Sequence, residues 1–241
     1  MLYIVSTPIG NLKDITFRAV EVLRAVDLIA AEDTRHSRIL LQHYDIATPV
    51  TSYFEHNKFK KGEYLLKVMK GGQSVALVTD AGTPGISDPG FHLIRLARDN
   101  GVPVTVVPGP CALIGALSVS GLPAHAFVFE GFLPTKSAAR RRKLAGFKDE
   151  ARTVIFYESP HRLIKTLQDF CDVLDNPRMV CVRELTKKFE EVRAGSCQDL
   201  IGHFSRISPK GEFVLLLSQG APACHSADSK INVTEEDGAP S

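Results

Sequence analysis

The sequence predicts an α/β protein of two domains, the first with a mostly parallel sheet and the second with a mixed sheet. Over the first 120 residues, short apolar runs alternate with stretches of helical periodicity, which is typical of parallel strands covered by helices. From about residue 126 strand-like runs outnumber helical ones, which favours some antiparallel pairing. The 241 residues are 44% hydrophobic and 23% charged, which supplies enough apolar material for such cores.

The first domain is expected to alternate strand and helix from its first residues. Strands are predicted at 2–6, 27–32, 74–78 and 102–109. Helices are predicted at 15–26, about 34–44, 60–72 and 90–100. The first helix shows the reason, because Phe17, Val20, Leu23 and Val26 recur at the spacing of one helix face.

The boundary between the two domains is expected at the Gly/Pro turn "SGLPAH" (120–125), between residues 122 and 123. The strands of the second domain are predicted at 126–132, 152–158, 178–185, 190–195 and 212–220, and its helices at about 137–147, 160–174 and 196–205. Residues 221–241 are small and polar without periodicity, so a flexible tail is predicted there.

Composition narrows the class of protein. No apolar run is long enough to span a bilayer, and the N-terminus lacks the basic region of a secretory signal, so a cytoplasmic protein is expected. The five cysteines are scattered without zinc spacing and the eight histidines occur singly, so no metal is expected. Formal charge is only +2, so a nucleic-acid partner would have to be met by local clusters of basic residues.

Three Gly/Pro turns follow strand ends: "STPIGN" (6–11), "TDAGTPGISDPG" (79–90) and "VVPGPCA" (106–112). The carboxyl ends of parallel strands share one edge of a sheet, so these turns are expected to converge on a ligand. The longest turn carries Asp80 and Asp88 and no lysine, which favours a cation, an amine or ribose hydroxyls over a bare phosphate. The alternative is a structural turn in which Asp88 caps the next helix.

Two further strand ends carry acids next to basic residues. "AEDTRHSR" (31–38) and "YESPHR" (157–162) offer catalytic or phosphate-binding groups. For the first, a capped helix start with a salt bridge from Asp33 to Arg35 is an equal alternative. "RELTKKFEE" (183–191) offers a general base or a plain charged loop.

The segment "PTKSAARRRK" (134–143) holds five basic residues and no acid: Lys136, Arg140, Arg141, Arg142 and Lys143. In isolation such a run is usually a solvated helix face, yet beside a ligand site it would suit a polyanion. "HNKFKKGEY" (56–64) is a weaker signal of the same kind.

Seven segments in this order are together similar to one family: "STPIGNLKDIT", "AEDTR", "TDAGTPGISDPG", "VVPGPCA", "EGFLP", "YESPHR" and "RELTKKFEE". From residue 1 to 220 the chain resembles the ribosomal RNA small-subunit methyltransferase I family, within the tetrapyrrole-methylase-like (class III) methyltransferases. The resemblance implies two α/β domains with S-adenosylmethionine in the cleft between them, a homodimer, and 2′-O-methylation of a cytidine in the decoding centre of the small ribosomal subunit.

The resemblance also implies roles for particular residues. Residues expected on the cofactor are Pro8, Asp80, Gly82, Thr83, Ile86, Cys111, Ala112, Tyr157 and Leu185. Candidates to assist the ribose hydroxyl are Glu158, Glu184 and Lys188. Candidates for RNA contact are Arg35, Arg162 and the five basic residues of 134–143. Thr83 stands where the wider superfamily has an acid, which argues against a porphyrin-precursor substrate.

Other functions stay open at this point. Another class III methyltransferase would act on a tetrapyrrole or a protein side chain, and neither acceptor needs the basic run at 134–143. A non-enzymatic RNA-binding or assembly factor would keep the fold without methyl transfer. A nucleotide-binding oxidoreductase is disfavoured because no G-x-G-x-x-G turn is present.

Overall fold

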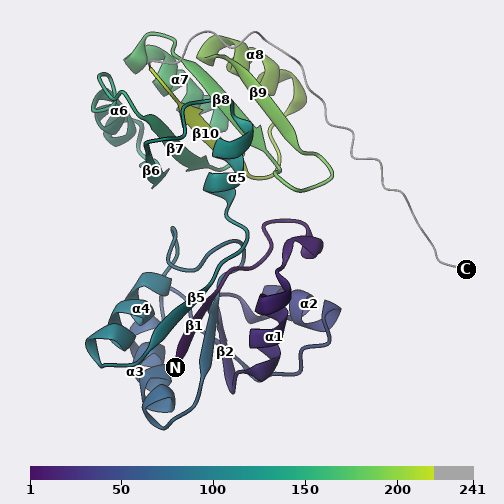
Figure 1. Ribbon diagram of the computed structural model, residues 1–241. Coiled ribbons are helices and arrows are strands. Elements are labelled where there is room, and N and C mark those ends of the chain that lie inside the picture. Colours follow the sequence, from purple (N-terminus) through teal and green to yellow (C-terminus); the bar gives the residue numbers. More distant parts are fainter. Residues whose placement is uncertain (220–241) are drawn as a thin grey trace, which may run out of the picture. The chain divides into compact units, whose positions relative to one another are not determined.

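The computed structural model describes residues 1–219, and the chain forms two compact units (Figure 1). The first unit is Met1–Ala112 and the second starts at Leu113. The predicted tail and the last residue of the predicted strand 212–220 lie outside the described residues. Helix α5 (Ala112–Val119), which the sequence analysis did not predict, begins where the two units meet along the chain, ahead of the turn at 120–125.

The first unit is built on a five-stranded sheet of order β3-β2-β4-β1-β5, in which every pairing is parallel. Its strands are β1 (Leu2–Val5), β2 (Leu28–Ala31), β3 (Val50–Ser52), β4 (Val75–Val78) and β5 (Val104–Val107). The predicted parallel sheet is therefore confirmed, with β3 as an addition. That edge strand escaped prediction because it has three residues and none is fully buried.

Four helices cover the two faces of this sheet (Figure 1). They are α1 (Phe17–Ala25), α2 (Thr34–His43), α3 (Lys58–Lys70) and α4 (Gly90–Asp99). One core packs apolar residues of α1 and α2 against the sheet, and the other packs those of α3 and α4. The Thr16 hydroxyl accepts from the Ala19 N–H and so caps α1. A short 3₁₀ turn (Leu12–Asp14) precedes that helix.

The second unit has a mixed sheet of order β6-β7-β10-β8-β9, as predicted. Its strands are β6 (Phe127–Phe132), β7 (Thr153–Glu158), β8 (Arg178–Arg183), β9 (Glu191–Ser196) and β10 (Phe213–Leu217). The β6–β7 pair is parallel and the other three pairs are antiparallel. A register shift interrupts the β6–β7 pair, where Gly131 has a φ of 63°.

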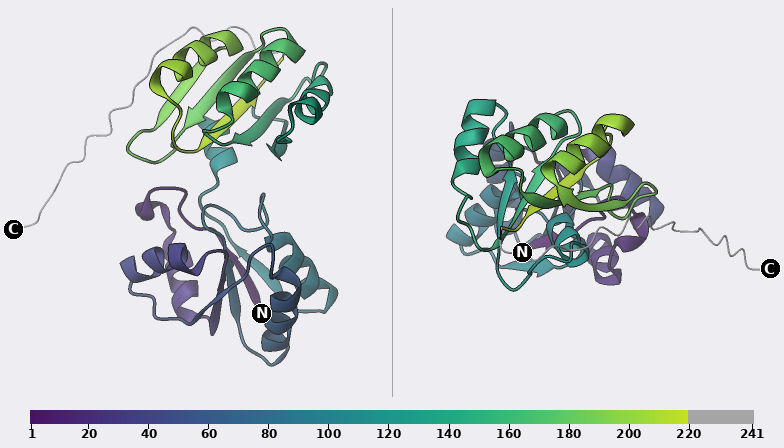
Figure 2. Two further views of the ribbon diagram at one scale, coloured as in Figure 1. Left: turned by 180° about the vertical axis from the view of Figure 1, so that it is seen from behind. Right: turned by 90° about the horizontal axis from the view of Figure 1, so that it is seen from above.

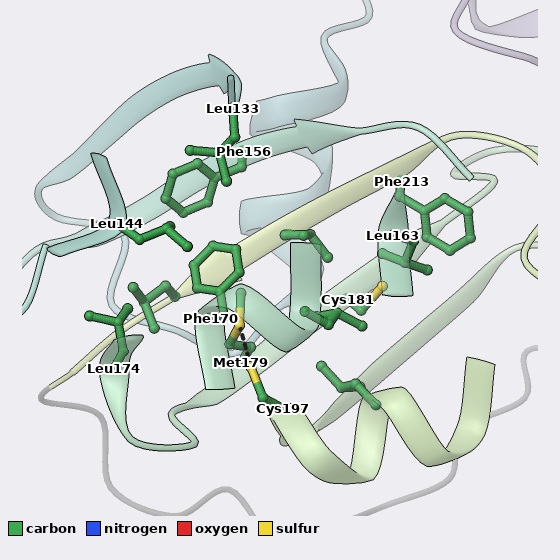
Figure 3. Packing of buried hydrophobic residues seen from close by; sticks show 14 of the residues in the cluster. Leu133, Leu144, Phe156, Leu163, Phe170, Leu174, Met179, Cys181, Cys197 and Phe213 are labelled. Atoms are coloured by element: carbon green, nitrogen blue, oxygen red, sulfur yellow. Dashed lines mark hydrogen bonds between the residues drawn. The ribbon is translucent and has the colours of Figure 1, made fainter. Parts of the chain in front are cut away.

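Helices α6 (Ser137–Ala145), α7 (Leu163–Leu174) and α8 (Cys197–Ile207) cover one face of the second sheet (Figure 2). Their core is rich in aromatic rings that meet edge to face, such as Phe156 against Phe170 with centroids 5.3 Å apart (Figure 3). Each fully buried side chain of this size contributes about 1.5–3 kcal/mol of burial free energy. Among residues 1–219, no helix is long and apolar enough to cross a membrane.

Candidate functional site

The three Gly/Pro turns of the first unit are hydrogen-bonded to one another at the carboxyl edge of the sheet. Thr7 and Gly82 exchange backbone bonds in both directions, at 2.9 and 3.0 Å. The Ser6 and Thr83 hydroxyls lie 2.9 Å apart, and the Thr83 hydroxyl donates to the Pro110 carbonyl at 3.2 Å. The predicted convergence of the turns is therefore confirmed, and Thr83 lies where all three meet.

Two glycines favour the close approach of these three turns. Gly82 has a φ of 86°, in the left-handed region that side chains disfavour. A Cβ on Gly109 would lie 3.0 Å from the Ser6 Cβ, a tight contact that a glycine avoids where the third turn approaches the first. These glycines keep peptide groups open at the edge of the sheet, where a ligand can lie against backbone.

Asp80 is held in place by its neighbours and by burial. Its carboxylate accepts from the Asp33 N–H at 3.0 Å, which ties the turn after β4 to the turn after β2. Glu32 accepts from the Thr79 hydroxyl at 2.5 Å and from the Asp80 N–H at 3.4 Å. Burial, together with the charge of Glu32, raises the pKa of Asp80. The sequence did not predict Glu32 as a site residue, although Glu32 lies in the segment "AEDTR" (31–35) that resembles the family.

Asp88 has the plainer role that the sequence allowed, since it closes the turn and caps α4. Its carboxylate accepts from the Gly85 N–H at 2.8 Å and from the Gly90 N–H at 2.7 Å. Burial raises the pKa of Asp88. A Cβ on Gly90 would lie 2.7 Å from the same carboxylate, so this cap needs glycine at the first helical position.

The other cofactor residues expected in this unit lie on the same three turns. Pro8 is buried in the first turn, and Ile86 is 40% exposed in the second. Cys111, a free thiol, and Ala112 are half-buried in the third. The unit thus presents carboxylate, hydroxyl, backbone and apolar groups at one edge. The turn 79–90 contributes no cation.

In the second unit, two predicted residues meet at helix α5. The Tyr157 hydroxyl accepts from the Leu113 N–H at 3.2 Å, in the first turn of that helix. A Cβ on Gly115 would lie 2.8 Å from Leu185 Cδ2, so the leucine packs directly on the helix backbone. The Tyr157 ring also meets Phe129 and Phe132 edge-on, at 5.0 and 5.8 Å. Tyr157 and Leu185 therefore share an element that the sequence analysis missed.

The structure argues against Glu158 as a general base. Its side chain is buried, with the residue 3% exposed. The carboxylate accepts from the Ser159 N–H at 2.8 Å, the Thr166 hydroxyl at 2.6 Å and the Arg162 guanidinium at 3.3 Å. These bonds fix the start of α7 and leave no open face toward a ribose hydroxyl. Glu158 is a structural carboxylate.

The other two base candidates differ from each other. Glu184 has a φ of 50°, and its carboxylate accepts from Lys187 Nζ at 2.9 Å and from the Glu212 N–H at 3.0 Å. Lys188 is exposed, and within residues 1–219 no ion pair engages it. Of the predicted candidates, Lys188 therefore has the accessible functional group.

The basic run at 134–143 divides into an inner and an outer set. Arg140 is 4% exposed and pairs with Asp169 at 2.6 Å, so the prediction that it contacts RNA is wrong for a physical reason: it is buried in the fold. Arg141 bridges Asp169 and Asp172 at 3.2 and 2.7 Å. The sequence concealed this because Asp169 lies 29 residues away from Arg140.

The outer set keeps its charge available. Lys136 and Arg142 are exposed, and in the described part of the chain neither forms an ion pair with an acid. Lys143 pairs with Glu130 at 2.6 Å but stays partly exposed. Arg162 donates to the Leu133 carbonyl at 2.7 Å, which directs it into the unit.

Arg35 follows the alternative that the sequence left open. Asp33 caps α2 by accepting from the Arg35 N–H at 2.8 Å, and it pairs with the Arg35 guanidinium at 2.6 Å. This pair lowers the pKa of Asp33. The Arg35 side chain is 88% exposed, so the predicted RNA contact stays a prediction. Among the described residues, no group of three or more histidine, cysteine or acidic side chains is arranged to hold a metal ion.

Comparison with known proteins gives consistent matches along the chain. The family described as Tetrapyrrole (Corrin/Porphyrin) Methylases matches residues 1–201. Ribosomal RNA small subunit methyltransferase I of Synechocystis sp. is 48% identical over 237 residues, which cover 98% of this chain and 85% of that protein. The protein of the same name from Escherichia coli O157:H7 is 52% identical over 219 residues, covering 90% and 77%.

A solved structure shows the same fold at lower identity. Uroporphyrin-III C-methyl transferase from Thermus thermophilus, complexed with S-adenyl homocysteine, matches with a TM-score of 0.64 and 17% identity. The match covers 89% of this chain and 96% of that one.

Proposed function

Because the chain belongs to the ribosomal RNA small subunit methyltransferase I family of the tetrapyrrole methylases, we propose that it methylates the 2′-hydroxyl of a cytidine in the decoding centre. It is an S-adenosylmethionine-dependent ribosomal RNA methyltransferase. The observation that carries this function is the sequence identity of about 50% with ribosomal RNA small subunit methyltransferases I, over nine-tenths or more of this chain. The cytidine and the 2′-oxygen are the proposed part, and they rest on the resemblance of the seven sequence segments.

The residues of the first unit fit S-adenosylmethionine. Gly82 and Gly109 leave backbone uncovered where the turns meet, and the turn 79–90 holds acids without a lysine or arginine. We propose that Asp80 receives the hydroxyl or cationic groups of the cofactor, and that Thr83, Ile86, Cys111 and Ala112 line its surface. From the second unit, Tyr157 and Leu185 are the proposed contributors.

When bound, S-adenosylmethionine supplies an electrophilic methyl group, so the protein needs mainly to orient the acceptor oxygen. Such positioning lowers a barrier by several kcal/mol when the reacting atoms are aligned. Carbonyl oxygens of the Gly/Pro turns can receive weak C–H···O contacts from a cationic ligand. The rigid hydrogen bonds among Ser6, Thr83 and Pro110 keep those carbonyls in place before the ligand arrives.

For the ribose hydroxyl, we propose that Lys188 stabilises the 2′-oxygen while its proton passes to solvent water, and that Glu184 is the less accessible alternative, which would accept the proton itself. An ammonium near the 2′-oxygen would stabilise the negative charge that develops there. The Lys188→Met variant should bind S-adenosylmethionine normally and transfer methyl more slowly. Glu158→Gln serves as the structural comparison, because it should lower stability through the start of α7.

The proposed substrate is the small ribosomal subunit, and binding it requires that the protein contact phosphates of the RNA. Lys136, Arg142 and Lys143 are the proposed contacts of the second unit, with Arg35 as a candidate in the first. Such contacts would add affinity without reading sequence. We also propose that the protein acts as a homodimer in the cytoplasm, where ribosomal subunits are assembled.

The decisive experiment incubates the protein with labelled S-adenosylmethionine and small subunits that lack the modification. The expected result is one label per subunit on a cytidine ribose, mapped by nuclease digestion and by resistance of the adjacent bond to alkali. Label on a base, on a ribosomal protein or on an added tetrapyrrole would reject 2′-O-methylation. RNA binding without any methyl product would favour an assembly factor instead.

A further inference from the structure

The first unit carries an exposed aromatic and basic surface that the proposed function has not used. It is named here the α3–α4 rim and lies in the loop before α3 and in the first turns of α3 and α4. Its exposed residues are Phe54, Phe59, Lys60 and Phe91, and its half-buried residues are Lys58 and His92. Phe59 is 68% exposed and Phe91 is 64% exposed. A contiguous patch of exposed apolar side chains is typical of an interaction surface, whereas a single exposed ring is not.

Topology places this rim beside the three Gly/Pro turns. Strands β3 and β4 are members of one parallel sheet, so their carboxyl ends lie at the same edge. Five residues, 53–57, separate the end of β3 at Ser52 from the start of α3 at Lys58. Helix α4 starts directly at the end of the turn 79–90, and Phe91 is its second residue. Both helices pack on the same face of the sheet (Figure 1).

Contacts join the two helix starts into one surface. The Phe59 ring meets the His92 ring edge-on at 4.9 Å. A Cβ on Gly62 would lie 3.6 Å from the His92 ring, so the helices approach closely just behind the exposed rings. The rim is therefore a shared edge of two helices and not a set of separate side chains.

Cations accompany the rings. Lys58 Nζ lies 5.4 Å from the Phe59 ring centre, and it also pairs with Glu55. Lys60 is exposed, and within residues 1–219 no ion pair engages it. Further along α3, Lys61 Nζ lies 5.2 Å from the ring of Tyr64, which is 48% exposed. Helix α3 as a whole carries five lysines and one glutamate, Glu63, which gives it a formal charge of +4.

We propose that the α3–α4 rim is a docking surface for unpaired bases of the RNA substrate. This inference rests on the proposed function and deepens it. Proteins that bind single-stranded RNA stack bases on exposed aromatic rings, while neighbouring basic side chains contact the phosphates. Phe59 and Phe91 provide the stacking faces, and Lys60 provides the phosphate contact. A second copy of the chain is disfavoured as the occupant, because two such rims would bring like charges together.

The test compares substitutions of Phe59 that separate stacking from general apolar contact. Phe59→Leu keeps an apolar side chain and removes the ring, whereas Phe59→Trp keeps a stacking face. Phe17→Leu is the matched control, since Phe17 is 91% exposed on α1, on the opposite face of the sheet. Measurements are the Kd for a single-stranded RNA oligonucleotide, KM and kcat with unmethylated small subunits, Kd for S-adenosylmethionine, and the unfolding midpoint.

Phe59→Leu should raise the RNA Kd and the KM by roughly 5- to 100-fold, as expected for the loss of one stacked base. The RNA Kd and the KM of Phe59→Trp and of Phe17→Leu should stay near the wild-type values. In all three variants, kcat, the Kd for S-adenosylmethionine and the unfolding midpoint should be unchanged. Combining Phe59→Leu with Phe91→Leu should weaken RNA binding further.

Two results would overturn the docking surface. One is an unchanged RNA Kd in the double variant, and the other is a change in oligomeric mass, which would identify the rim as a contact between copies. Failure of the proposed function gives a different result, because the wild-type protein itself would then transfer no methyl group to ribosomal RNA.

Discussion

Asp80 is the residue in which burial, charge and the proposed cofactor contact come together. Its carboxylate accepts from the Asp33 N–H, and Glu32 accepts from the Thr79 hydroxyl and from the Asp80 N–H at the start of the turn. A partly buried carboxylate next to another acid is a less stable anion, which is the reason its pKa is raised. A bound cation would relieve that cost, which supports the proposed contact between Asp80 and a positively charged ligand.

The affinity for S-adenosylmethionine should depend on the protonation of Asp80. Because the raised pKa lies above the ordinary value of 3.8, affinity should be full at neutral pH and fall on acidification before an ordinary aspartate would protonate. Asp80→Asn should weaken binding by about 10-fold at neutral pH, or ~1.4 kcal/mol, and remove this pH dependence. Calorimetric titration across the pH range measures both. A variant that keeps the wild-type profile would exclude Asp80 from the contact.

Cysteine alkylation should report on the third Gly/Pro turn. Cys111 is a half-buried free thiol, whereas burial raises the pKa of Cys197 to about 12 and that of Cys181 well above its usual range. Iodoacetamide should therefore modify Cys111 in the native protein and spare Cys181 and Cys197. Added S-adenosylhomocysteine should slow the modification of Cys111, followed by peptide mass spectrometry. Equal rates with and without ligand would remove Cys111 from the proposed pocket.

At the scale of elements, helix α6 shows how one basic run serves two purposes. Arg140 points into the unit, where Asp169 of α7 accepts from it and from the Ser137 hydroxyl. Arg142, two residues later, is exposed. Residues two apart lie on different sides of a helix, so the same segment joins α6 to α7 and presents charge to solvent.

Arg140→Met should destabilise the protein by about 3–5 kcal/mol, because it leaves the buried Asp169 carboxylate without its main partner. Arg142→Ala should change the free energy of unfolding by less than about 0.5 kcal/mol and weaken RNA binding instead. Urea denaturation and RNA titration of both variants separate the two effects. Equal stability of the two variants would show that the Arg140 pair is dispensable to the fold.

For the whole molecule, a formal charge of +2 means that attraction to RNA must come from particular surfaces. The described units carry two proposed surfaces of this kind, one formed by Lys136, Arg142 and Lys143 at the two ends of α6 and one at the α3–α4 rim. Each is small, so contact with a large RNA would gain affinity from several weak sites that act together.

Removing two phosphate contacts should lower the salt dependence of RNA binding by a defined amount. For single-stranded RNA, the logarithm of affinity falls with that of salt concentration with a slope of about −0.7 per neutralised phosphate. The Lys136→Ala, Arg142→Ala double variant should therefore bind more weakly with a slope shallower by about 1.4. Lys148→Ala, an exposed lysine beyond α6, is the control. An unchanged slope would mean that the two side chains do not meet phosphates.

Much of the fold was predictable from the sequence because local signals agreed with one another. Helical spacing predicted α1 to α4, and apolar runs predicted most strands. The Gly/Pro turns predicted the edge of the first sheet at which they meet. Short elements escaped prediction, such as β3 and α5, since three strand residues or eight mostly apolar helix residues show little periodicity. The site was therefore predicted as a set of turns but without the helix that Tyr157 and Leu185 contact.

The sequence by itself determined most of the strands and helices, the Gly/Pro turns at the strand ends, and the acids that favour a cationic ligand. Only the tertiary structure decided which charged side chains are free. Glu158 and Arg140 look like functional groups in the chain and are buried partners in the fold. The physical reason is distance along the chain. Burial and pairing depend on residues that the fold brings together from other elements, such as Asp169, and local periodicity does not predict those contacts.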